Sequence, residues 1–193
     1  MTSRPCAHCP GQMPLTARAD ARYCSTRCRV AAHRARRTVP AELTSRPRWV
    51  RHTARKVPLT STGDIASSTD ASTWSRHRDA VRSTAGAGLG FVLNGDGVVC
   101  LDLDHALDGA GIPLPWAQSI LDSAPDTWVE VSRSGTGLHI WGHGDLPHGR
   151  RITTSGGSVE LYGTGRFIAV TGETFGDTPR RLGDLSALIT QLL

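Results

Sequence analysis

The sequence predicts an α+β domain that follows a small cysteine-rich module. Four of the five cysteines lie within the first 28 residues, and the later part of the chain alternates short β-rich segments, glycine turns and a few helical segments. Strands joined mainly as hairpins and covered by a few helices are typical of α+β domains. A chain of 193 residues, 38% of them hydrophobic, can form one core and one small module that is stabilised in another way.

The N-terminal cysteines are spaced like the ligands of a metal ion. Cys6 and Cys9 form a CxxC pair, and after fourteen residues Cys24 and Cys28 form a CxxxC pair. Four thiolates at this spacing suit tetrahedral, structural Zn²⁺, whose binding would supply about 10 kcal/mol of folding free energy. We expect residues 1–37 to form a treble-clef or ribbon-like zinc module, with the second cysteine pair one turn apart on a helix.

Basic residues concentrate near the N-terminus. Residues 1–56 carry 13 basic and two acidic side chains, a net charge of +11, whereas residues 57–193 carry nine and 15, a net charge of −6. Arginines on one helix can lie along a phosphate backbone and release its counterions. We expect nucleic-acid contacts from Arg27, Arg29, Arg34, Arg36 and Arg37. A solvated basic segment without a specific partner, or a module that binds protein, are the alternatives.

The segment after this module predicts a linker. Residues 38–48 contain two prolines and no periodic apolar pattern, so the larger domain is expected to cover residues 49–193. No apolar run reaches the length of a membrane span, and the N-terminus lacks the apolar segment of a signal peptide. We therefore expect a soluble, cytoplasmic protein with no membrane partner.

The larger domain is predicted to begin with a strand and turn at residues 49–60. Cap-forming Ser, Thr and Asp then precede a helix within residues 68–85, and Cys100 is expected in the core. Glycine-containing turns predict three hairpins, and apolar periodicity predicts two helices. The hairpins join residues 89–93 to 98–105, 127–132 to 138–142, and 158–162 to 166–172, and the helices cover residues 114–124 and 182–193.

Two aspartates at the end of an apolar strand indicate a cation site. Asp102 and Asp104 are two residues apart, and alternate strand residues face the same side. Two carboxylates placed together repel each other unless a cation lies between them. A divalent-metal site is indicated, and the alternative is a strand end with two solvated aspartates.

The next two predicted hairpins carry further polar residues. A turn with glycine, serine and arginine can hold phosphate oxygens, and an imidazole can donate to them. The candidate phosphate ligands here are Ser132, Arg133, Ser134 and His139. Glu160 lies in an apolar strand, where a carboxylate is costly unless it is paired or metal-bound. Arg166 is either its salt-bridge partner or another phosphate ligand, and His139 is alternatively a core histidine.

Three ordered motifs resemble a known family. They are DLD at 102–104, SGTGLHIW at 134–141 and VELYGTGRFIAVTG at 159–172. Together they resemble the bifunctional DNA primase/polymerase domain of phage and plasmid replication proteins, within the archaeo-eukaryotic primase superfamily. The likeness extends over residues 49–172.

This resemblance implies a fold, an activity and a set of site residues. It implies a primase-like core, in which a catalytic sheet like that of an RNA-recognition motif (RRM) is fused to a small α/β unit. Asp102, Asp104 and Glu160 would hold two Mg²⁺ or Mn²⁺ ions, and His139 would contact the phosphates of the incoming nucleotide. The implied enzyme is a template-directed nucleotidyltransferase that extends a 3′-hydroxyl during replication of a phage, plasmid or integrated element. Its partners would be single-stranded DNA template, primer, and NTP or dNTP.

The likeness also leaves alternatives open. The sequence ends at Leu193, before the helical region and helicase domain that often follow in this family, so we expect primer extension rather than de novo priming, with a separate replicative helicase. One alternative is a catalytically inactive, zinc-containing module that binds nucleic acid or a replisome partner. Another is a metal-dependent hydrolase that uses His139, His143 and His148. Additional phosphate contacts are expected from Arg55 and Lys56.

Overall fold

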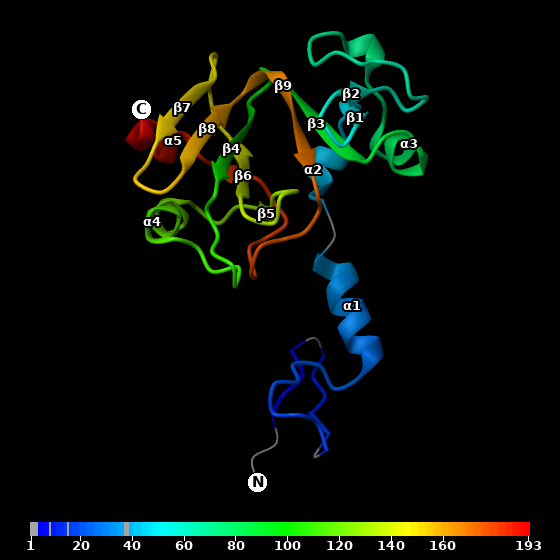
Figure 1. The fold of residues 1–193 in the computed structure, drawn as a ribbon, viewed down its shortest axis with the longest axis vertical. Coiled ribbons are helices and arrows are strands. Elements are labelled where there is room, and N and C mark those ends of the chain that lie inside the picture. The colour runs from blue at the N-terminus through cyan, green and yellow to red at the C-terminus, as the bar shows by residue number, and fades with distance from the viewer. Residues whose placement is uncertain (1–3, 8, 15, 37–38) are drawn as a thin grey trace. The chain divides into compact units, whose positions relative to one another are not determined.

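The computed structural model describes residues 4–7, 9–14, 16–36 and 39–193, and of residues 32–36 only the backbone. The chain divides into two compact units, residues 1–38 and residues 39–193 (Figure 1).

The first unit contains one regular element, α1 (Thr26–Arg36), among its described residues. Ser25 caps this helix: its carbonyl accepts a hydrogen bond from Arg29 N–H at 3.0 Å, and its hydroxyl accepts one from Cys28 N–H at 3.2 Å. Cys24 therefore precedes the helix. This corrects the expectation that both cysteines of the second pair lie within it, because the capping serine lies between them.

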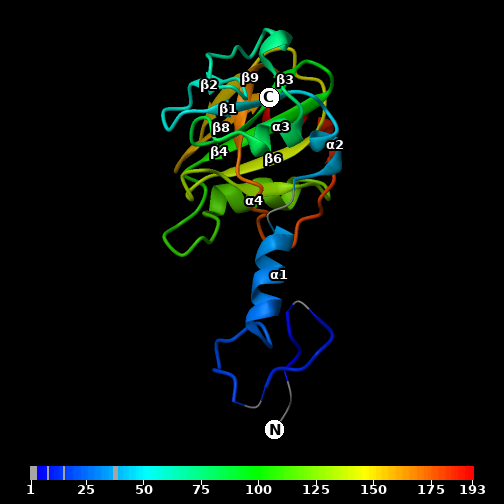
Figure 2. The ribbon, with the colours of Figure 1, turned by 90° about the vertical axis from the view of Figure 1, so that its right-hand side faces the viewer.

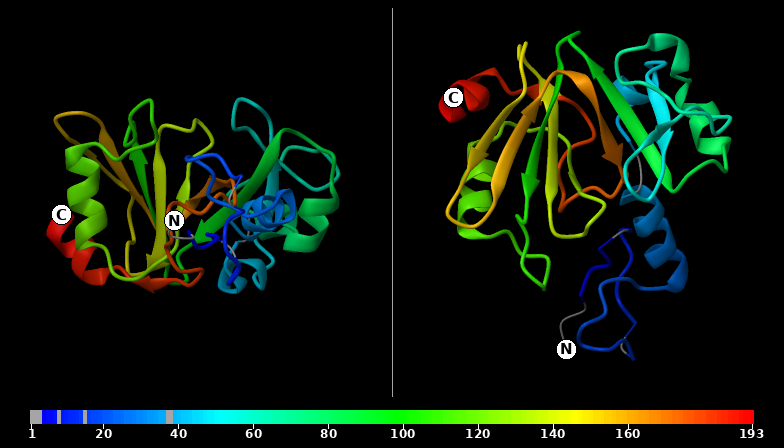
Figure 3. Two further views of the ribbon diagram at one scale, coloured as in Figure 1. Left: turned by 90° about the horizontal axis from the view of Figure 1, so that it is seen from below. Right: turned by 45° about the horizontal axis from the view of Figure 1, so that its top comes forward.

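The second unit is an α+β fold with two sheets, as predicted (Figures 1 and 3). The four-stranded sheet has the order β2-β1-β3-β9: β2 (Pro58–Leu59), β1 (Trp49–His52), β3 (Gly88–Asn94) and β9 (Thr164–Val170). The other has the order β10-β6-β4-β8-β7, with β5 also paired to β6: β10 (Gly183–Asp184), β6 (Leu138–His143), β4 (Val98–Asp104), β8 (Ser158–Tyr162), β7 (Arg150–Thr153) and β5 (Val129–Val131). Neighbouring strands are antiparallel except β10 and β6.

Alternation along β4 directs its side chains into two different environments. Leu101 and Leu103 pack with residues of α4 (Pro115–Ser123) and α5 (Ser186–Leu192), the helices that cover one face of the six-stranded sheet (Figure 3). Cys100 is fully buried in a second core, as predicted, with Phe91 of β3 and Trp141 of β6. Asp102 and Asp104 share the face of Cys100 and are both partly exposed, because they lie beyond this second core.

Two of the three predicted hairpins are wrong. β5 and β6 pair as predicted, but β3 pairs with β1 and β9, and β4 pairs with β6 and β8. The turns after β3 and β8 thus carry the chain from one sheet to the other. The two turns are joined by a hydrogen bond from Gly95 N–H to the Gly163 carbonyl, at 3.0 Å. The sheets diverge from this corner (Figure 1).

Residues 39–48 also differ from the predicted linker. They contain the short helix α2 (Ala41–Thr44), whose Leu43 is fully buried. Trp49 Nε1 donates to the Leu43 carbonyl at 3.1 Å, and Leu182 N–H donates to Glu42 Oε2 at 2.9 Å. This segment belongs to the larger unit because Leu43, these two hydrogen bonds and the ion pairs of Arg46 and Arg48 with Asp96 anchor it there.

The remaining helices are short. The predicted helix within residues 68–85 consists of a 3₁₀ turn, η1 (Ala71–Thr73), and α3 (His77–Arg82), which contacts β1 (Figure 2). Asp70 caps the 3₁₀ turn by accepting from Ser72 N–H at 3.0 Å, as its position before the helix suggested. Within the described part of the chain, no helix has the length and apolar character needed to cross a membrane.

Candidate functional site

Five polar side chains form a row across the six-stranded sheet. Asp102 of β4 lies opposite His139 of β6 on one side and opposite Glu160 of β8 on the other. The row continues to Glu130 of β5, opposite His139, and to Arg151 of β7, opposite Glu160. Directly paired residues point to the same face of a sheet and come within contact distance. We call this set the cross-strand row.

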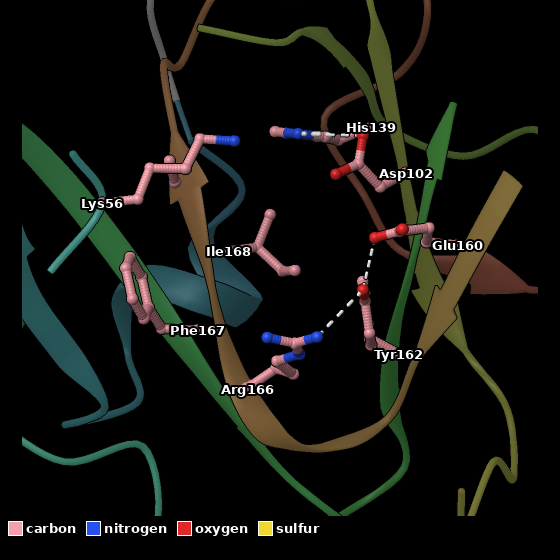
Figure 4. Close-up of a pocket in the computed structure, with 9 residues that line it drawn as sticks. Lys56, Asp102, His139, Glu160, Tyr162, Arg166, Phe167 and Ile168 are labelled. Carbon is pink, nitrogen blue, oxygen red and sulfur yellow. Dashed lines mark hydrogen bonds and ion pairs between the residues drawn. The ribbon is translucent and has the colours of Figure 1, made fainter. Parts of the chain in front are cut away.

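The row opens into a pocket of about 200 Å³ between the two sheets. One wall carries the side chains of Asp102, His139, Glu160 and Tyr162, and the other consists of β9 residues 166–169 (Figure 4). A basic side chain lies at each end of the pocket. Lys56 lies toward the His139 end, and Arg166 lies toward Tyr162 (Figure 4). The carboxylates lie between these two ends.

Glu130 holds the imidazole ring of His139 through a hydrogen bond. The Nδ1 atom of His139 donates to Glu130 Oε1 at 2.9 Å, and Glu130 is completely buried. The same carboxylate accepts from Trp141 Nε1 at 3.2 Å, from Thr171 N–H and hydroxyl at 3.0 Å each, and from Gly172 N–H at 2.8 Å. Five hydrogen bonds compensate the burial of this carboxylate and fix the orientation of the imidazole ring.

The free edge of the His139 ring faces the acids. Its Nε2 atom lies 3.6 Å from Asp102 Oδ1. Burial lowers the pKa of His139, but the hydrogen bond and charge of Glu130, together with the charge of Asp102, outweigh this and raise that pKa above its ordinary value. A raised pKa favours the form of the ring with a proton on both nitrogens, and in that form Nε2 can donate to an anionic ligand.

The carboxyl groups of the site have the character of cation ligands. Burial raises the pKa of Asp102, and the charges of Asp104 and Glu160 act in the same direction against those of His139 and Lys56. Among the described side chains, Asp104 has one weak partner, the hydroxyl of Ser158 at 3.5 Å. Asp102, Asp104 and Glu160 do not converge as tightly as the four N-terminal cysteines do. Carboxylate oxygens are the type of ligand that divalent cations prefer, and a cation beside Asp102 would relieve the repulsion between the acids.

Glu160 has partners other than the one suggested by the sequence. Arg151 Nε lies 3.5 Å from Glu160 Oε1, and the Tyr162 hydroxyl donates to Glu160 Oε2. Burial and the bond to Glu160 raise the pKa of Tyr162 to about 12. Arg166 stacks over the Tyr162 ring, with its guanidinium carbon 5.0 Å from the ring centre. The expected alternative of an Arg166–Glu160 salt bridge is wrong, because cross-strand pairing brings Arg151 to Glu160.

The serines and arginine of the β5–β6 turn do not line this pocket. Ser132 Oγ lies 3.1 Å from Ser134 Oγ and accepts from Gly137 N–H at 3.2 Å, so both hydroxyls take part in the turn itself. Arg133 Nη1 lies 3.1 Å from His52 Nδ1 at the end of β1. Arg133 thus extends toward the β1–β2 turn that carries Lys56.

His143 and His148 are not gathered around His139. His143 Nε2 lies 3.7 Å from Glu42 Oε2, and His148 is exposed in the loop before β7. Among the described residues, three or more potential metal ligands converge only at the four cysteines. The structure offers no support for a histidine-based hydrolase site.

The four cysteines form a separate cluster in the first unit. The sulfur atoms of Cys6, Cys9, Cys24 and Cys28 all lie within 4.8 Å of one another, and three of the separations are 3.5, 3.6 and 3.7 Å. Four ligands at a Zn–S length of 2.3 Å form a tetrahedron with edges of about 3.8 Å. The cluster is thus compatible with structural zinc and suggests a zinc module, as predicted. Arg27 and Arg29 are exposed on α1. Arg37 and the side chains of Arg34 and Arg36 lie outside the described residues.

We expect purified protein to contain about one tightly bound Zn²⁺ per chain, because four preorganised thiolates form a complete ligand set. Elemental analysis measures this content. Cys24→Ser should lose the metal and Cys100→Ala should retain it, since Cys100 lies in the other unit. Absence of zinc, together with four freely titrating thiols in the folded protein, would contradict the assignment.

Glu130 is a residue of the cross-strand row that sequence reasoning missed. It lies in the segment TWVEVS, in an apolar strand, and so carried the same signal that singled out Glu160. Its role depends on being opposite His139, which alternation within one strand does not reveal. The signal could have identified a buried carboxylate, but not its partner.

Fold and site together define an α+β protein with a carboxylate–histidine row in a pocket lined at both ends by cations, and with a four-cysteine module. No family model matches the sequence. The chain is homologous to the DNA primase-polymerase of Nitratiruptor phage NrS-1, with 37% identity over 137 residues that cover 66% of this chain and 19% of the relative. The predicted relationship to phage primase-polymerases is confirmed. The chain spans about a fifth of the length of this relative.

Proposed function

We propose that the larger unit, residues 39–193, forms a DNA primase/polymerase domain that adds nucleotides to a primer 3′-hydroxyl under the direction of a template. The observation that supports this proposal is the cross-strand row. Its acids and its buried histidine line a pocket that has a basic side chain at each end. The name of the phage relative, a DNA primase-polymerase, supports the same reaction class. We also propose that the six-stranded sheet, with α4 and α5 on one face, is the RRM-like catalytic sheet of this family.

Asp102, Asp104 and Glu160 would hold two Mg²⁺ or Mn²⁺ ions. When bound, such ions lower the pKa of the attacking hydroxyl and neutralise charge on the triphosphate and its leaving group. The position of Asp102 next to Glu160 across the sheet, and two residues before Asp104, is what supports this ligand set. Burial makes the charged form of Asp102 less favourable than it is in water, and a bound cation would offset this.

His139 and Lys56 are the proposed ligands of the nucleotide triphosphate. Both lie at the same end of the pocket, and the bond from His139 Nδ1 to Glu130 leaves Nε2 to donate to a phosphate oxygen (Figure 4). Arg133 lies beside the β1–β2 turn and would add positive charge at this end. Ser132 and Ser134 would contribute indirectly, by stabilising the β5–β6 turn that carries Arg133.

The main alternative is an inactive module that binds nucleic acid or a replisome partner through the zinc unit. Incubation of the protein with single-stranded template, all eight nucleotides and either metal, with and without a primer, distinguishes these functions. Extension of the primer supports the proposed reaction, and products without a primer would add de novo priming. Absence of incorporation under every condition would favour the inactive module.

The exposed arginines of α1 should contribute to template binding. Replacing Arg27 and Arg29 together with glutamine is expected to weaken binding of single-stranded DNA and to reduce the slope of log K against log salt by about 1.4, since each phosphate contact contributes about 0.7. Fluorescence anisotropy over a salt series measures this slope. Arg18→Gln is the control, because Arg18 already pairs with Asp20 at 3.3 Å. An unchanged slope would place the binding surface elsewhere.

A further inference from the structure

A second hollow continues the pocket toward the edge strand β7. It has a volume of about 500 Å³ and shares Glu160, Tyr162 and Arg166 with the pocket of the cross-strand row. Its outer wall carries Arg150 and Arg151 of β7. We call this hollow the arginine groove, after Arg150, Arg151 and Arg166.

The arginine groove carries more positive charge than its surroundings neutralise. Arg151 pairs with Glu160, the single acid of the groove. Arg150 and Arg166 have no acidic partner among the residues for which the structure describes side chains. Residues 57–193 contain nine arginines and 15 acids, so three arginines around one hollow are a local excess. Such an excess beside a pocket attracts a polyanion.

The groove is also shaped to receive a backbone phosphate. Arg166 is held by stacking on Tyr162 and by a 3.4 Å hydrogen bond from Nη2 to the Tyr162 hydroxyl, and its other N–H groups remain able to donate to a ligand. Gly165 has a φ of +68°, and a Cβ atom there would meet nothing within 4 Å. The turn between β8 and β9 therefore leaves open space next to Arg166.

The two ends of the pocket suit two different polyanions. This inference rests on the proposed function, in which the carboxylates must lie between the nucleotide triphosphate and the strand that is extended. His139 and Lys56 occupy the end proposed for the triphosphate, and Arg166 occupies the opposite end (Figure 4). We infer that the arginine groove binds the sugar–phosphate backbone of the primer strand next to its 3′ end.

The test compares Arg150→Gln with the unaltered full-length chain. Primer extension measures KM for primer–template and KM for nucleotide separately, and anisotropy with labelled primer–template measures the salt slope. The primer–template KM should rise roughly three- to tenfold and the slope should fall by about 0.9, as for one lost phosphate contact. The KM for nucleotide should not change. Arg180→Gln is the matched control, because Arg180 is an exposed arginine outside the groove, without an acidic partner in the described part of the chain.

Each other outcome has a distinct meaning. A higher KM for nucleotide with an unchanged primer–template KM would assign the groove to the triphosphate and overturn the inference. Equal effects of Arg150→Gln and Arg180→Gln would also overturn the inference, because the effect would then depend only on the net charge of the protein. If the unaltered protein extends no primer, the proposed function fails. The salt slope then decides about the groove on its own: a decrease specific to Arg150→Gln supports it, and an unchanged slope overturns it.

Discussion

Replacing Asp102 and Asp104 together with alanine is expected to reduce nucleotide incorporation about 100-fold or more, because loss of even one preorganised charge stabiliser typically has an effect of this size. The two carboxylates share one face of β4 and would hold both metal ions, so the double substitution affects both ions. Without metal, removal of two repelling acids should leave the melting temperature unchanged or slightly higher. Binding of the template should change little, since the arginines of α1 are retained.

Three measurements test this prediction. Primer extension gives the rate, and thermal melting with and without Mn²⁺ gives metal binding, since a ligand at 100 times its Kd stabilises the folded state by about 2.7 kcal/mol. The unaltered protein should be stabilised by Mn²⁺ and the double variant should not. Asp145→Ala with Asp177→Ala is the control, because both residues are exposed and the charge change is the same. A double variant that extends primers at a comparable rate would show that the site is assigned wrongly.

Replacing Glu130 with glutamine is expected to destabilise the fold and to reduce activity together. Oε1 of Glu130 accepts from His139 and Trp141, and Oε2 accepts from Thr171 and Gly172. A glutamine has one acceptor oxygen, so its NH₂ group would face donors on one of the two sides. Loss of a buried charged partner typically costs about 3 kcal/mol or more, which lowers the melting temperature of a domain of this size by roughly 6–12 °C.

The positioning role of Glu130 predicts a specific kinetic effect. A reoriented imidazole should raise KM for nucleotide and lower kcat, while KM for primer–template stays constant, because His139 lies at the triphosphate end. Glu130→Asp keeps the charge and should restore part of both parameters. Glu173→Gln, an exposed carboxylate of the next segment, is the control. A Glu130→Gln protein that melts as the unaltered chain does, and binds nucleotide equally well, would contradict this role.

Local patterns predicted much of the molecule correctly. The cysteine spacing predicted a cluster that the structure shows, and turn residues with alternation predicted the β5–β6 hairpin. The placement of Asp102 and Asp104 on one face followed from alternation alone. Glu160 was singled out because a lone carboxylate in an apolar strand needs a partner. These features depend on residues that are close in the sequence, where propensity and periodicity act directly.

The sequence by itself determined most of the strands and helices, though not α2, β7 or β10. It also determined which side chains of β4 face the apolar core, and that four thiolates can gather. Only the tertiary structure decided which strands become neighbours. The turns after β3 and β8 contain glycines, as hairpin turns do, yet they cross between the sheets. Phe91 of β3 and Trp141 of β6 pack together in the core between the two sheets. Glu130 meets His139 and Arg151 meets Glu160 within the hairpins β5–β6 and β7–β8. Non-local pairing of β4 with β6 and β8 then brings Asp102 between His139 and Glu160, a neighbourhood that spacing along the chain could not reveal.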